Sequence, residues 1–203
     1  MPENVLTIHS LVEAHFYAAL AVCPACARCG LMIQGTFTVE RAGAPVLGAS
    51  AGCSHCAAET TLAFDTRLCE PADLQSAAIA RMPVIVSRVA EPSAAIDVSQ
   101  WLTLYRMAVE SSEFPSERVL IRAALLEAGA CLAEALKFYS PDSDIPPPSA
   151  FFSEESRARF AEYSHLFIRD RLLDLASGLP TSVTQPPTPV TRNRPASTKW
   201  WLR

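Results

Sequence analysis

The chain has 203 residues, half of them apolar, and a formal net charge of −4. This length suits one domain, or a small module joined to a larger one, and the apolar fraction is sufficient for a buried core. Residues 181–203 hold four basic residues and no acid, so the rest of the chain carries −8, which argues against a protein that mainly binds a phosphate backbone.

Residues 1–92 are predicted to form a small β-rich module with an N-terminal segment. The β-branched and aromatic residues of 31–40 and 60–66 favour strands, and 84–86 is a third, shorter candidate. The opening segment, 6–21, is ambiguous, and residues 74–81 fit a short helix. Five of the seven glycines lie between residues 30 and 52, which indicates a turn-rich stretch.

Residues 93–180 are predicted to form a helical domain. Apolar spacing predicts helices at 97–110, at 116–139, from 153 onward and at 165–176, with Asp97, Ser116 and Ser153 at the starts of the first three. The loops between these helices are short, which favours a bundle of about four antiparallel neighbours. The expected fold class is therefore α+β.

Residues 181–203 are predicted to form a disordered tail, because they are rich in proline and threonine and carry isolated basic residues. Near its end stand Trp200, Trp201 and Leu202. Tryptophans often dominate the binding energy of interfaces, and a proline-rich spacer lets such a segment reach a partner. These three residues are the candidate docking peptide for a partner protein.

Two cysteine pairs stand 26 residues apart, Cys23-Pro24-Ala25-Cys26 and Cys53-Ser54-His55-Cys56. A CxxC turn places two thiolates on one side of a tight knuckle, and two such knuckles supply the four ligands of a tetrahedral zinc site. We therefore predict one structural Zn²⁺ per chain, bound by Cys23, Cys26, Cys53 and Cys56 in a zinc-ribbon arrangement. Cys29, which follows the first pair closely, is the alternative ligand.

The expected compartment is the cytoplasm. The N-terminus has no basic stretch followed by an apolar run and a cleavage site, and no apolar run reaches the length of a membrane span. In a reducing compartment paired cysteines indicate metal binding more often than disulfides, and an odd count of seven agrees with that interpretation.

No catalytic motif is present. The segment from Gly43 to Ser50 has the glycine spacing of a phosphate-binding loop but lacks its lysine, and there is no GxSxG or HExxH sequence. Basic residues in the ribbon region are limited to Arg28, Arg41 and Arg67, which is a thin patch for binding nucleic acid.

Several segments together resemble a family of small bacterial proteins that pair a zinc knuckle with a helical segment. They are the two CxxC pairs and residues 91–93, 96–106, 134–139, 146–154 and 171–175. The resemblance covers about residues 5–180 and implies this architecture and the four zinc ligands, but no reaction. Where such proteins carry a glycine after the first knuckle, this chain has Ala27 and then Cys29.

The expected function is that of a non-enzymatic zinc-binding interaction or adaptor protein, as a subunit of a larger complex. One alternative is a nucleic-acid-associated zinc-ribbon regulatory protein. A third hypothesis is that the protein is an enzyme with an unrecognised site.

Overall fold

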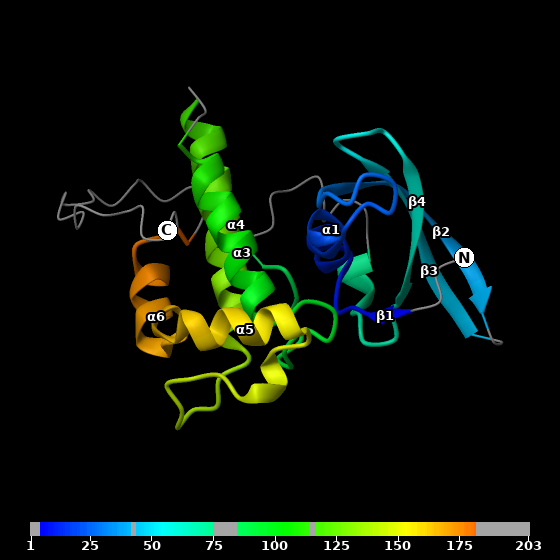
Figure 1. Cartoon of the computed structure of the whole chain (residues 1–203). Helices are drawn as coiled ribbons and strands as arrows, with labels where there is room; N and C mark the ends of the chain where they lie inside the picture. The colour runs from blue at the N-terminus through cyan, green and yellow to red at the C-terminus, as the bar shows by residue number, and fades with distance from the viewer. Residues whose placement is uncertain (1–4, 42–43, 75–84, 114–116, 182–203) are drawn as a thin grey trace.

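The computed structural model describes residues 5–41, 44–74, 85–113 and 117–181. Within these residues the fold is α+β, as predicted, with one four-stranded sheet and five α-helices (Figure 1). The candidate docking residues Trp200, Trp201 and Leu202 lie outside the described residues, as does all of the predicted tail beyond residue 181.

The sheet consists of β1 (Leu6–Thr7), β2 (Leu31–Arg41), β3 (Ala44–Cys53) and β4 (Glu59–Asp65) in the order β1-β4-β3-β2. The last three strands are antiparallel, and β1 pairs parallel with β4. The predicted strands at 31–40 and 60–66 are confirmed. The candidate at 84–86 is wrong in its described part, because Ile85 and Val86 belong to no strand and Val84 lies outside the described residues.

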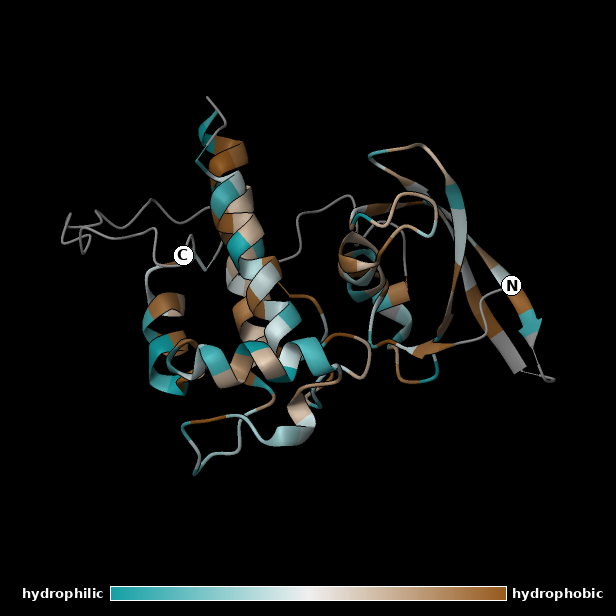
Figure 2. Ribbon diagram, in the orientation of Figure 1, coloured by the Kyte–Doolittle hydropathy of each residue, from teal (hydrophilic) through white to brown (hydrophobic). Residues whose placement is uncertain are grey.

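Most of the opening segment 6–21, whose structure the sequence left ambiguous, forms helix α1 (Leu11–Leu20). This helix lies between the sheet and the other helices (Figure 1). Tyr17 packs edge-on against Phe64 of β4, with ring centroids 6.0 Å apart. Phe16 packs in the same manner against Trp101 of α3, at 5.6 Å. Nearly all sides of α1 are apolar (Figure 2), as expected for a helix covered by two layers.

Two long helices, α3 (Val98–Ser111) and α4 (Arg118–Leu136), pack side by side. Asp97 caps α3 as predicted, in a capping box with Gln100. For α4, the predicted cap at Ser116 is wrong, because the N-cap residue is Glu117 and its side chain makes no capping hydrogen bond. Ser116 itself lies outside the described residues.

The C-terminal part contains α5 (Glu154–Glu162), capped by Ser153 as predicted, and α6 (Arg169–Ser177). The single helix predicted at 165–176 is wrong in its first turn. Residues Ser164–Phe167 form the 3-10 helix η3, and the extended backbone of Ile168 separates it from α6. Shorter 3-10 turns occupy Pro71–Leu74 (η1) and Pro148–Ala150 (η2), while residues 75–81 of the helix expected at 74–81 lie outside the described residues.

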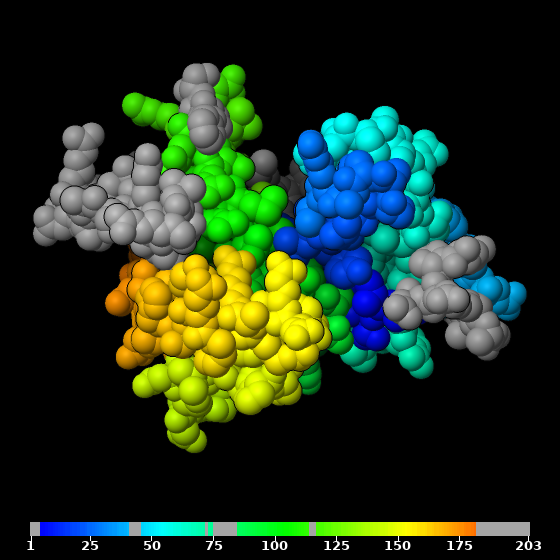
Figure 3. All heavy atoms as spheres, in the orientation of Figure 1, coloured from blue at the N-terminus to red at the C-terminus, as the bar shows by residue number. Residues whose placement is uncertain are grey.

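One hydrophobic core runs through both predicted parts of the chain. It contains Ala49 and Phe64 from the sheet together with Trp101 and Leu132 from the helices. In the space-filling view the helices and the sheet accordingly meet around α1 (Figure 3). A separate, smaller cluster of apolar side chains lies beside the cysteine pairs.

Candidate metal centre

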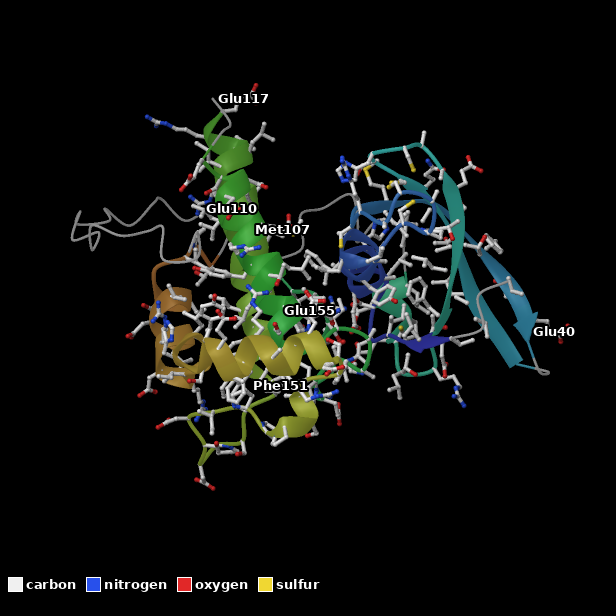
Figure 4. All side chains as sticks on the ribbon, viewed as in Figure 1. Glu40, Met107, Glu110, Glu117, Phe151 and Glu155 are labelled. Atoms are coloured by element: carbon white, nitrogen blue, oxygen red, sulfur yellow. The ribbon has the colours of Figure 1, made fainter. Side chains whose placement is uncertain are left out.

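Four cysteine sulfur atoms lie together at one end of the sheet (Figure 4). Cys23 and Cys26 come from the loop between α1 and β2. Cys53 is the last residue of β3, and Cys56 lies in the loop between β3 and β4. The Sγ atoms of Cys23 and Cys56 are 3.7 Å apart, as are those of Cys26 and Cys53, and all four lie within 4.8 Å of one another. A tetrahedron with zinc–sulfur bonds of about 2.3 Å has sulfur–sulfur edges of about 3.8 Å, so the cluster has the size of a four-thiolate metal site.

The two CxxC loops fold alike. In each, the N–H of the first cysteine donates to a carbonyl five residues later, from Cys23 to Arg28 at 2.8 Å and from Cys53 to Ala58 at 2.9 Å. In each, the residue after the second cysteine donates its N–H back to the carbonyl of the first. The same backbone turn therefore presents both pairs of sulfur atoms.

Alanine stands in the left-handed conformation in both loops. The φ angles of Ala27 and Ala57 are 57° and 58°. A residue with a side chain is strained there, and glycine is the usual occupant. Ala27 and Ala57 therefore occupy equivalent positions in the two loops.

Two hydrogen bonds from the second loop to the first hold the pairs in register. The imidazole Nε2 of His55 lies 3.0 Å from the carbonyl oxygen of Cys29, and the N–H of Ser54 donates to the carbonyl of Gly30 at 3.0 Å. His55 therefore supports the cluster without entering it, as a residue between two ligands is expected to do. The alternative ligand Cys29 is exposed and is not one of the four cysteines that gather, so the preferred set is the one brought together.

Cys23 and Cys53 are buried, Cys26 is half-buried and Cys56 is exposed. The apolar side chains beside them belong to Ala18 of α1, Leu31 of β2 and Ala51 of β3. One side of the cluster thus faces the end of the sheet, and the other is open at Cys56. An ion can enter from solvent and then be held by four ligands.

The backbone around the second loop favours a thiolate. The N–H groups of His55 and Cys56 lower the pKa of the Cys53 thiol to about 6. The nearby N–H of Ala58 also favours the thiolate of Cys56, but desolvation of the thiol by the surrounding cluster and hydrogen bonds with the three neighbouring sulfur atoms outweigh it and raise the pKa of Cys56 to about 12. A second thiolate beside that of Cys53 is favoured only when a cation lies among the sulfur atoms.

The other cysteines and histidines of the described residues lie outside the four-cysteine cluster. Cys131 is buried in the core, and burial raises the pKa of its thiol well above the ordinary value. Cys69 donates to the carbonyl of Ile8 at 3.2 Å. His9 is buried and His15 is half-buried, while His165 is exposed on η3. Among the described residues, none of these joins a group of metal-binding side chains.

One buried polar cluster was not predicted from the sequence. Lys137, just after α4, donates to the carboxylate of Glu134 at 2.8 Å and to the carbonyl of Val89 at 2.7 Å. Close by, the carboxylate of buried Glu13 accepts the N–H of His9 at 2.5 Å. The signal available in the sequence was Glu134 and Lys137 three residues apart at the end of an apolar helix, but spacing alone does not show that such a pair is buried.

Comparisons of the chain with models of protein families, with curated proteins and with solved structures found no match. Among the described residues, none of the helices combines the length and the apolar character that crossing a membrane requires.

Proposed function

We propose that the protein is a zinc-binding, non-enzymatic adaptor whose metal holds the two cysteine loops and the ends of the sheet together. The observation that carries this proposal is the four-sulfur cluster, with its 3.7 Å contacts and shared backbone turn. Four thiolates fill a tetrahedral site and leave no position for substrate or water, which is typical of structural zinc and not of catalytic zinc.

Zinc is favoured over other metals by the ligand set. Four thiolates in tetrahedral geometry suit zinc or iron and exclude the hard cations that prefer oxygen. The antiparallel strands β2 and β3 connect the first CxxC loop to the second. This arrangement supports a zinc ribbon.

Metal analysis of the purified full-length chain tests this proposal. We expect one zinc per chain in the natural protein and in Cys29→Ser, and a loss of bound zinc in Cys26→Ser. Cys29→Ser is the matched control, because it removes an exposed thiol three residues away that lies outside the cluster. Loss of zinc from Cys29→Ser with retention by Cys26→Ser would overturn the ligand assignment, and stoichiometric iron would overturn the identity of the metal.

The adaptor role rests on surfaces that suit a protein partner. In the first turn of α4, Val119 is 72% exposed and Leu120 is 48% exposed. The ribbon is coloured as hydrophobic near this end of α4 (Figure 2). Adjacent exposed apolar side chains of this size are candidates for burial in an interface. The tail adds Trp200 and Trp201 at the end of a basic, proline-rich segment, which supports its role as a docking peptide.

Co-purification from the native cell separates the two surfaces. Partners recovered with the full chain are compared with those of a chain lacking residues 196–203 and of Val119→Ser/Leu120→Ser. If a partner is lost from only one of the two variants, the surface changed in that variant binds the partner. An unchanged set of partners in both variants would remove the adaptor proposal while leaving the metal site standing.

A further inference from the structure

A cleft opens among the C-terminal helices, away from the cysteine cluster. It lies between α3, α5, η3 and α6, opens to solvent and encloses a volume of about 50 Å³. Its apolar lining comes from Leu102 and Val109 of α3, Leu166 of η3, and Leu172 and Leu175 of α6. Helix α5 packs against α3, and α6 packs against α4 and η3; in the space-filling view the residues of α5 and α6 form one continuous surface (Figure 3).

Three arginines line the same cleft, one from each of three helices. Arg106 belongs to α3, Arg159 to α5 and Arg171 to α6, and no carboxylate is among the lining residues. Guanidinium groups bind carboxylates and phosphates through paired hydrogen bonds. An apolar cavity bordered by three such groups is complementary to a molecule with an apolar body and an anionic head.

The protein neutralises the charges of Arg106 and Arg159 only in part. The nearest carboxylate to Arg106 is that of Glu110, 3.7 Å from Nε, and this Nε atom is buried without a hydrogen-bond partner. Arg159 donates to a neutral group, the hydroxyl of Thr103, at 2.6 Å. Glu155 lies at the first turn of α5, one turn from Arg159 (Figure 4), and it does not line the cleft.

The electrostatics of Arg159 agree with this description. Burial and the positive charge of Arg106 lower its pKa, and the negative charges of Glu155 and Asp97 offset only part of that effect. Two guanidinium groups that repel each other beside an apolar wall are stabilised when an anion binds between them.

We propose that this cleft binds a small amphipathic carboxylate, with the apolar body against the leucines and the carboxylate at Arg106 and Arg159. Arg171 adds a third positive charge at the α6 wall. The chain's own tail does not suit the cleft, because residues 181–203 are basic and would add like charge. This inference concerns the helical part of the protein and is independent of the metal proposal.

Octanoate is the probe, and octan-1-ol, which has the same chain length and no charge, is its control. Binding to the full-length, metal-loaded protein is measured by titration calorimetry and by shifts of backbone amide resonances. We expect octanoate to bind at least about tenfold more tightly than octanol, since hydrogen bonds to a charged partner contribute that much. The amides that shift should be those of α3 and α6.

In Arg106→Gln/Arg159→Gln the advantage of octanoate should disappear while the affinity for octanol is kept. Arg118→Gln is the matched control, because Arg118 is an exposed arginine at the start of α4 that does not line the cleft. Retained octanol binding shows that the double variant is folded at the cleft. Equal affinity for the two probes in the natural protein, no binding of either, or an equal loss in Arg118→Gln would overturn the proposal.

Discussion

Asp97 joins the start of α3 to the start of α5, and replacing it should cost more than an ordinary helix cap. Its side chain is fully buried. One carboxylate oxygen accepts the N–H of Gln100 at 2.8 Å, which caps α3, and the other accepts the N–H of Phe152 at 3.1 Å, just before α5. Loss of a cap costs about 1 kcal/mol, and loss of a hydrogen bond to a charged group costs about 1.5–3 kcal/mol.

We therefore expect Asp97→Ala to lower the free energy of unfolding by about 3 kcal/mol, and the melting temperature of a chain of this size by about 6–12 °C. Asp97→Asn should cost roughly half as much. Asparagine is a good cap and keeps one acceptor oxygen, but its amide NH₂ cannot accept from Phe152. Urea unfolding of the metal-loaded chain, followed by far-UV circular dichroism, measures both changes.

Asp142→Ala is the control for Asp97, because Asp142 is an exposed acid in a loop and its replacement should change stability by less than about 0.5 kcal/mol. A loss in Asp97→Asn equal to that in Asp97→Ala would show that the cap contributes little. A change below about 0.5 kcal/mol in Asp97→Ala would refute the claim that this carboxylate connects the two helices.

Three further changes follow from the structure. Ala27→Gly and Ala57→Gly should each raise the free energy of unfolding of the metal-loaded chain by about 0.5–1 kcal/mol, because each removes the strain of an alanine in the left-handed conformation. A lower free energy of unfolding, measured by urea titration, would contradict this. Lys137→Met should lower it by about 3–5 kcal/mol, because Glu134 is left buried and unpaired, and Glu134→Gln in the same chain should recover part of that loss in the same assay. Burial lowers the pKa of His15 below 6.5, so the unfolded chain binds the proton more readily and stability falls as the pH drops through 6.5. The fall in melting temperature between pH 7.5 and pH 6 should be smaller in His15→Leu than in the natural protein. An equal fall in both would exclude His15 as a source of this pH dependence.

The strand β3 shows where sequence patterns mislead about this fold. Its glycines suggested turns, but Gly48 and Gly52 lie inside the strand, opposite Phe37 and Met32 of β2. A Cβ atom on Gly48 would come within 2.4 Å of the Phe37 ring, and one on Gly52 within 2.4 Å of the Gln34 amide. The glycines make room for side chains of the neighbouring strand, a long-range contact that local composition does not reveal.

Helix positions were more predictable, because their signals are local. The capping box of α3 and the Ser153 cap of α5 are each encoded within four residues. The break between η3 and α6 was missed because its stabilising contacts are distant. Phe167 of η3 packs on Phe151 and Phe160, its carbonyl accepts the Tyr139 hydroxyl at 2.7 Å, and these contacts fix the turn before Ile168.

The two candidate sites also differ in how far local sequence signals predict them. The cysteine cluster could be predicted because each pair is held by one local turn, so only the meeting of two turns depended on the fold. The three arginines of the cleft stand at positions 106, 159 and 171, with no spacing that marks them among the other basic residues. Their juxtaposition follows from the packing of α5 against α3 and of α6 against α4 and η3. This packing depends on the aromatic contact between Phe160 and Phe167 and on the second hydrogen bond of Asp97. A loss of octanoate binding in Asp97→Asn would therefore connect that hydrogen bond to the shape of the cleft, since the substitution leaves all three arginines in the chain.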